Sequence, residues 1–319
     1  MTDAADDGSA ALHELLTTVN QTWEQMLERS PSTIRRVRIA EKDLEIVLVG
    51  EELTSILLPG LEWHRDAIGR PSVTVGAWDA EATAVPLPAP LVARDPLVKR
   101  WTATHQGRLM AGADWSDPGM FRLGDRYADR HLLGVSSPVV LHRWESGAPL
   151  RRQLWWALGP EVLFAHAAAV GSTEGAALIM GASGSGKSTT SLACLGAGMG
   201  FISDDYCLVR DDPPVVHLLA PTARVHAHEL ALLGDLSDSA VTQRQRDGAP
   251  TEKALLYLHR VVPERLVQSA PVRVVLLPEF AEERSPRLVR VSAADALRAV
   301  APAALWQMHV EPGRELQGL

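Results

Sequence analysis

The sequence is poor in several features that would assign a protein to a familiar class. Cysteine occurs twice in 319 residues, at Cys194 and Cys207, and this spacing indicates neither a disulfide framework nor a metal site. No apolar run reaches the length of about 18 residues that a transmembrane helix requires. The first ten residues are acidic and lack the apolar core of a signal peptide. We therefore expect a cytoplasmic protein that has no membrane partner.

An excess of positive charge is also missing. The formal net charge is −8 and the isoelectric point is near 5.8, which argues against nucleic acid as a main partner. Hydrophobic residues make up 46% of the chain and charged residues 22%, so the composition allows a large core. Because single cores seldom grow beyond about 250 residues, the length predicts two domains.

A glycine-rich stretch carries the clearest chemical signal. An apolar run, Ala176–Met180, precedes it, and a helix-like run, Ser188–Leu195, follows it. The stretch has the phosphate-loop pattern of two glycines four residues apart followed by Lys-Ser, in which backbone N–H groups and a helix N-terminus face phosphate oxygens. We predict that Lys187 neutralises nucleotide phosphates and that the Ser188 hydroxyl holds Mg²⁺. The predicted nucleotide-binding residues are Gly181, Ala182, Ser183, Gly184, Ser185, Gly186, Lys187, Ser188 and Thr189.

A pair of carboxylates, Asp204 and Asp205, follows the next predicted strand, Phe201–Ser203. A helix that retreats and a strand that returns bring this pair to the sheet edge that carries the phosphate loop. One carboxylate can bind the metal, and the other can accept a proton from an attacking hydroxyl. The alternative interpretation is a solvated Asp-Asp turn.

A histidine lies on the predicted strand before the loop. Val162–Val170 and Ala176–Met180 flank a turn and predict a hairpin. If Val170 faces Ala176, His166 lies opposite Met180, beside the phosphate loop. A histidine in an apolar strand can equally be a core residue, so the hairpin leaves both interpretations open.

These three segments, HAAAV, GASGSGKST and ISDDYCLV, resemble HPr kinase/phosphorylase and its relatives in the PEP-carboxykinase-like P-loop group. Closer still are the HPr-kinase-like proteins of modified-peptide pathways, including lasso-peptide kinases. The resemblance covers about 60 residues and implies transfer of a phosphoryl group from ATP, with Mg²⁺, to a serine or threonine hydroxyl of a peptide or protein. It gives catalytic roles to His166, Lys187, Asp204 and Asp205, and metal-binding roles to Ser188, Asp204 and Asp205.

The family signature expected after the acidic pair is not present. Residues 218–230, LLAPTARVHAHEL, stand in its place and supply Arg224, His226 and His228. The resemblance therefore does not extend to HPr as the substrate or to a hexamer, although a homo-oligomer remains an expectation. The acceptor that we expect is a serine or threonine on a small ribosomal peptide.

The predicted architecture is α/β, with a PEP-carboxykinase-like P-loop kinase core at residues 149–319. A smaller α+β domain at residues 1–148, expected to help to recognise the substrate, precedes it. Its helix is predicted from Ser9 to Arg29, with an apolar stripe. Further strands are predicted at Thr33–Ile39, Leu44–Val49, Ser72–Trp78, Arg108–Ala113, Met120–Leu123, Arg130–Val135, Val139–Trp144, Tyr206–Val209, Val215–Leu219, Val272–Leu277 and Leu288–Val291.

Two other functions fit the same motifs. A small-molecule kinase also has a short spacing between the phosphate loop and an aspartate, although such enzymes normally begin near their loop, whereas this loop follows about 180 residues. A nucleotide-binding regulator that has lost transfer activity is the second alternative. The presence of Lys187, Ser188 and both aspartates argues against the regulator.

Overall fold

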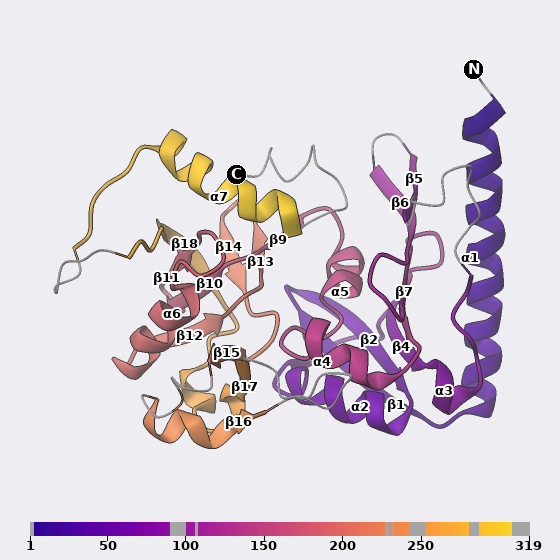
Figure 1. The fold of residues 1–319 in the computed structure, drawn as a ribbon, viewed down its shortest axis with the longest axis horizontal. Coiled ribbons are helices and arrows are strands. Elements are labelled where there is room, and N and C mark those ends of the chain that lie inside the picture. The colour runs from indigo at the N-terminus through magenta and orange to yellow at the C-terminus, as the bar shows by residue number, and fades with distance from the viewer. Residues whose placement is uncertain are drawn as a thin grey trace. The chain divides into compact units, whose positions relative to one another are not determined.

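The computed structural model describes residues 3–89, 100–105, 108–226, 230, 233–242, 253–280 and 287–307 (Figure 1). The described residues separate into two compact units, one up to Gly159 and one from Pro160 onward. Both contain helices and mixed sheets, so the chain has an α/β fold. None of the described helices is both long enough and apolar enough to cross a bilayer.

The first unit is built on one mixed sheet, whose described strands follow the order β3-β1-β2-β4-β8-β7-β6-β5. Strand β4 runs parallel to β2 and to β8, and the other neighbours are antiparallel. The strands are β1 (Ser32–Ile39), β2 (Lys42–Val49), β3 (Arg65–Asp66), β4 (Val73–Asp79), β5 (Arg100–His105), β6 (Arg108–Asp114), β7 (Met120–Asp125) and β8 (Arg130–Val135). The strands predicted at Thr33–Ile39 and Leu44–Val49 do pair, but the turn lies at residues 40–41 rather than at the expected residues 41–43, because Lys42 and Asp43 already pair with β1.

Helix α1 (Asp3–Arg29) covers one face of this sheet with its apolar stripe. Six stripe residues are buried against the strands: Leu12, Leu15, Leu16, Val19, Trp23 and Met26. The Trp23 ring meets the Trp78 ring edge-on at 6.3 Å. The approach requires glycine at position 76, because a Cβ there would lie 2.5 Å from the Trp23 ring. The helix begins at Asp3 rather than at Ser9, so Ser9 lies inside the helix and is not its N-cap.

The opposite face of the sheet carries α5 (Arg151–Leu158), whose Trp156 packs on Gly124 of β7. Gly124 and the neighbouring core residue Leu123 point to opposite faces because side chains alternate along a strand. The remaining short helices of this unit are α2 (Glu51–Leu57), α3 (Ala80–Thr83), α4 (Leu141–Trp144) and the 3₁₀ turns η1 (Leu58–Gly60) and η2 (Pro138–Val140).

The second unit contains a larger mixed sheet with the described order β12-β10-β11-β18-β14-β13-β9 and a small sheet, β15-β17-β16. Its strands are β9 (Val162–Ala165), β10 (Ala168–Ser172), β11 (Gly175–Ile179), β12 (Gly200–Ser203), β13 (Cys207–Arg210), β14 (Val215–His217), β15 (Thr222–His226), β16 (Ala240–Val241), β17 (Lys253–Tyr257) and β18 (Ser269–Leu276). Its helices are α6 (Lys187–Gly196), α7 (Ala293–Gln307) and the 3₁₀ turns η4 (Gly234–Ser239), η5 (Leu258–Arg260) and η6 (Pro263–Arg265).

The pairing of the second unit differs from the predicted hairpin in two respects. The predicted strand Val162–Val170 is divided into β9 and β10, and Val170 faces Ala177 rather than Ala176. Strand β12 does have the direction of β11, as predicted, but β10 lies between them and pairs antiparallel with both. The division arises because β9 pairs with β13 while β10 pairs with β11 and β12.

Two predicted strands are wrong. Val139–Trp144 is helical, because Pro138 occupies the first turn of a 3₁₀ helix that continues into α4. Leu288–Val291 has no regular structure, and no strand in the described part of the chain pairs with it. The final helix, α7, is capped by Ser292, whose Oγ accepts a hydrogen bond from the Asp295 N–H at 3.2 Å.

The structural division at Gly159 also differs from the boundary predicted before Pro149. Helix α5 belongs to the first unit, where its Gln153 Nε2 donates a hydrogen bond to the Leu132 carbonyl of β8 at 3.2 Å. The second unit therefore begins with the strand that leads to His166 and holds the residues of the phosphate loop and the acidic pair.

Candidate functional site

The phosphate loop joins the end of β11 to the start of α6. Its three glycines, Gly181, Gly184 and Gly186, have φ angles of 148°, 79° and 94°, which lie in the region that favours glycine. A Cβ on Gly181 would lie 2.8 Å from Ser185 Oγ, so the loop can close on itself only with glycine there. Ala182, Ser183 and Gly184 are exposed, as a loop that receives a ligand requires.

Lys187 is the first residue of α6, and its side chain folds back under the loop. Its Nζ donates hydrogen bonds to the carbonyls of Gly181 and Ala182, both at 3.0 Å, and the residue is only 7% exposed. Burial lowers the pKa of Lys187, while the nearby carboxylates of Asp205 and Asp204 raise it. The ammonium group thus lies where the loop begins, within the electrostatic reach of the acidic pair.

The acidic pair follows β12, in a tight turn closed by a hydrogen bond from the Tyr206 N–H to the Asp204 carbonyl at 2.7 Å. Asp205 has a left-handed φ of 67°, so the two adjacent side chains leave the turn in different directions. Asp204 is 4% exposed, whereas the Asp205 side chain is 38% exposed. The two carboxylates therefore have unequal surroundings.

Asp204 has a strongly perturbed pKa. Burial raises it, and the charge of Asp205 raises it further, to about 6. A hydrogen bond from the Arg224 N–H to Asp204 Oδ2 at 3.1 Å and one from the Ser188 hydroxyl favour the charged form. Asp204 Oδ1 is buried and has no hydrogen-bond partner among the residues that the structure describes.

His166 lies between β9 and β10, outside the paired strands. Its Nδ1 is 3.3 Å from Asp205 Oδ1, so the histidine meets the acidic pair rather than Met180. Its ring lies against Tyr206 at 5.2 Å, and Tyr206 in turn stacks on Phe164 at 5.0 Å. His166 therefore lies beside the acidic pair, and its role as a site residue stays a prediction. Tyr206 was expected only as a strand residue, although it directly follows the acidic pair.

The small sheet contributes basic residues near the pair. Arg224 on β15 reaches Asp204 through its backbone N–H, and the charge of Lys253 on β17 lowers the pKa values of both Lys187 and Asp204. His226 faces Lys253 across the β15–β17 ladder. His228 lies outside the described residues.

A nucleotide with Mg²⁺ fits this donor set. A hydroxyl and a carboxylate oxygen are the ligand types that Mg²⁺ uses beside nucleotide phosphates, and the Ser188 hydroxyl is near enough to Asp204 to favour its charged form. The unpartnered Asp204 Oδ1 supplies an oxygen that a cation would satisfy. In the described part of the chain, no three His, Cys, Asp or Glu side chains cluster as a metal site of their own. Metal binding here would therefore depend on phosphate oxygens as well.

No family model matches this chain, and no curated protein matches it. Among solved structures it is similar to the HPr(Ser) kinase/phosphatase from Coxiella burnetii, with 14% sequence identity and a TM-score of 0.26. The match covers 40% of this chain and 66% of that chain. A likeness at this level assigns no role to any residue.

Proposed function

We propose that this protein is an ATP-dependent kinase that transfers the γ-phosphoryl group to a serine or threonine hydroxyl of a peptide or protein. The observation that carries the proposal is the buried carboxylate of Asp204, which accepts a hydrogen bond from the Arg224 N–H and whose charged form is favoured by the hydroxyl of Ser188, the residue after the phosphate-loop lysine. A strongly perturbed acid beside a phosphate loop is typical of a site that binds a metal–nucleotide complex.

The nucleotide phosphates would lie against the backbone N–H groups of the loop and the N-terminus of α6. Lys187 would neutralise the β- and γ-phosphates, giving up its present bonds to the loop carbonyls. Ser188 and Asp204 would hold Mg²⁺, which spreads the charge that develops on the phosphate oxygens. Occupation of the site would keep Asp204 ionised despite its burial.

Asp205 is the better candidate for the proton acceptor, because it is more exposed than Asp204 and lies 3.3 Å from His166. As the acceptor oxygen bonds to the γ-phosphorus, the bond from that phosphorus to the bridging oxygen breaks and the hydroxyl proton passes to Asp205. His166, whose Nδ1 lies close to Asp205 Oδ1, would hold the Asp205 carboxylate in position. Proton removal of this kind contributes about 10²- to 10⁴-fold to a rate.

The test separates binding from transfer. Lys187→Ala, Asp204→Asn and Asp205→Asn would be compared for MgATP affinity by calorimetry and for transfer of labelled phosphate to a library of serine and threonine peptides. We expect Lys187→Ala and Asp204→Asn to lose MgATP binding, and Asp205→Asn to retain binding but lose transfer. Asp211→Asn is the matched control, since Asp211 is exposed in the β13–β14 turn of the same unit.

The alternatives give different results in the same assay. Transfer to free serine or other small alcohols but to no peptide would indicate a small-molecule kinase. MgATP binding by the wild type without transfer to any acceptor would indicate a regulator. Unchanged MgATP affinity in a folded Lys187→Ala variant would overturn the phosphate site itself.

A further inference from the structure

One strand of the second unit has an open edge that leads to the phosphate loop. On one side, the second half of β18 pairs with β11, from Val272 opposite Ala176 to Leu276 opposite Ile179. On the other side, β14 pairs only with Ser269, Ala270 and Pro271. Within the described residues, no strand pairs with residues 273–276 on that second side.

The backbone of Val275 faces the open side. The Met180 N–H donates to the Leu276 carbonyl at 2.9 Å, so Leu276 directs its backbone groups toward β11. Because these directions alternate along a strand, Val275 directs its N–H and its carbonyl away from β11. Backbone groups of this kind are matched by another extended polypeptide, and an open edge is a template for such pairing.

Apolar side chains flank the same edge. Val274 and Val275 are 46% and 44% exposed, although β18 lies in the interior of the strand order. They point to opposite faces of the sheet. A strand added at this edge could therefore form backbone hydrogen bonds with Val275 and contact one exposed valine on each face of the sheet.

The edge runs directly into the candidate active site. After β18 the chain passes the phosphate loop: a Cβ on Gly181 would lie 3.9 Å from Pro278 Cδ, and one on Gly186 would lie 3.6 Å from Phe280 Cζ. Phe280 is itself 83% exposed. A strand that pairs with residues 273–276 is thereby aimed at the loop that would hold the γ-phosphate.

We infer that residues 273–276 of β18 bind the peptide substrate as an added strand, which carries its acceptor hydroxyl toward the phosphate loop. This inference rests on the proposed kinase function. It identifies the substrate as a peptide segment that is extended, rather than helical or folded, next to the acceptor. The mode is strand addition, in which backbone hydrogen bonds supply affinity and alternate side chains supply selectivity.

The first test modifies the peptide, so that folding of the protein is not disturbed. A phosphorylated library peptide would be resynthesised with a single N-methyl group at each successive backbone nitrogen. Strand addition predicts that KM rises about tenfold at alternate positions and little at those between, the effect of losing one hydrogen bond. A flat profile, or one without a period of two, would overturn the inference.

The second test modifies the edge. Val275→Pro removes the outward N–H without removing a bond to β11, and Val275→Ala is the matched control that keeps it. We expect a higher peptide KM for Val275→Pro than for Val275→Ala, with unchanged MgATP affinity in both. Unchanged peptide KM in a Val275→Pro variant that has lost self-association in the ultracentrifuge would overturn the inference in favour of a second copy at this edge. If the wild type transfers phosphate to no peptide at all, the proposed function itself is refuted.

Discussion

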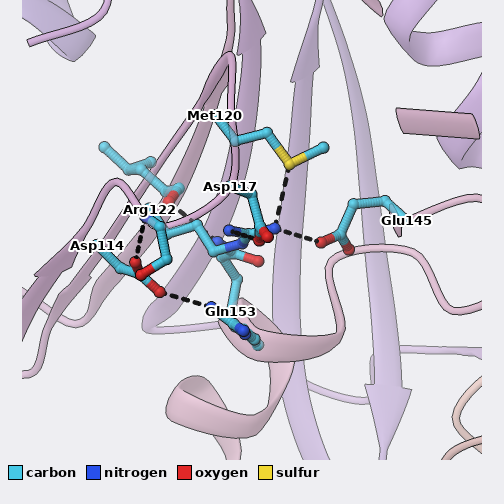
Figure 2. A network of polar contacts seen from close by, with 9 residues as sticks. Asp114, Asp117, Met120, Arg122, Glu145 and Gln153 are labelled. Atoms are coloured by element: carbon cyan, nitrogen blue, oxygen red, sulfur yellow. Dashed lines mark hydrogen bonds and ion pairs between the residues drawn. The ribbon is translucent and has the colours of Figure 1, made fainter. Parts of the chain in front are cut away.

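Each of the two units buries a carboxylate, but one carboxylate is paired with an arginine and the other lies next to a second carboxylate. In the first unit, Glu145 is completely buried and its Oε1 lies 3.2 Å from Nη2 of the completely buried Arg122 (Figure 2). The same guanidinium binds Asp117 at 2.6 Å. In the second unit, Asp204 is 4% exposed and faces another carboxylate, a backbone N–H and a hydroxyl.

The pKa of each central group reflects this difference. Burial by itself lowers the pKa of Arg122, but the carboxylates of Glu145, Asp117 and Asp114 outweigh it and raise the pKa overall. Burial and a like charge raise the pKa of Asp204 to about 6. Both carboxylates have a buried oxygen without a hydrogen-bond partner among the described residues, Glu145 Oε2 and Asp204 Oδ1, but only Glu145 is in contact with a cation. A buried carboxylate that contacts no cation costs stability, and a functional site can explain that cost.

Removing the cation from the first unit should give the largest effect. Arg122→Met keeps most of the side-chain volume but leaves Glu145 buried without its partner. We expect the free energy of unfolding of this unit to fall by about 3–5 kcal/mol, because the uncompensated charge remains in the core. Urea denaturation followed by tryptophan fluorescence measures it, since eight of the nine tryptophans precede Gly159.

The matched double variant, Arg122→Met with Glu145→Gln, separates charge from packing. If the loss comes from the unpaired carboxylate, the double variant recovers most of it. A double variant as unstable as Arg122→Met would show that the side-chain packing of Arg122, rather than its charge, supports the unit. Loss of the contact with Asp117 should contribute less to the destabilisation, because the Asp117 side chain is 15% exposed and can be hydrated.

The stability of the second unit should fall as the pH rises through the titration of Asp204. The pKa of Asp204 is raised from 3.8 to about 6 on folding, so the folded state binds a proton that the unfolded state has released between these values. Stability contributed by this group is therefore present at low pH and is lost as the pH rises through about 6. The shift in pKa corresponds to a loss of about 3 kcal/mol in stability once Asp204 is ionised. A carboxylate held by an arginine behaves in the opposite way, because it stabilises the folded state when it is ionised.

Asp204→Asn removes this titration and is the reference for the measurement. The labelling rate of Cys207 by a thiol reagent active in acid reports opening of the unit, because this thiol is fully buried on β13. Both proteins would carry Cys194→Ala. We expect the opening free energy of the wild type to fall below that of Asp204→Asn as the pH rises from about 4 to about 7, because only the wild type then carries a buried charge. A difference independent of pH would mean that Asp204 is ionised throughout.

Local sequence patterns identified the elements that depend on neighbours in the chain. The apolar stripe of α1, the β1–β2 pair and the strand–loop–helix around Lys187 all follow from short-range periodicity or from a motif. The cap at Ser292 follows from one side chain and one N–H three residues later. In each case, the determining interaction lies within a few residues.

Features that depend on distant pairing could not be predicted in this way. Alternation in VLFAHAAAV indicates one strand, and the interruption at His166 arises only because β9 and β10 have different partners. The hydrogen bond from Arg224 to Asp204 joins residues 20 positions apart through a backbone N–H, which leaves no signature in the sequence. Likewise, the insertion of β10 between β11 and β12 is a property of the whole sheet.

The smallest effect should come from removing an ion pair that is not buried, which shows how much of the Arg122 effect is due to burial. Arg36 and Glu45 are directly opposite on β1 and β2, with Arg36 Nε 2.9 Å from Glu45 Oε1, but their side chains are 60% and 28% exposed. Water already stabilises both charges, so Arg36→Ala should lower the unfolding free energy by less than about 1 kcal/mol, and salt near 0.5 M should reduce the difference further. The same fluorescence-detected urea titration tests this. A loss as large as that of Arg122→Met would show that burial does not account for the difference between the two pairs.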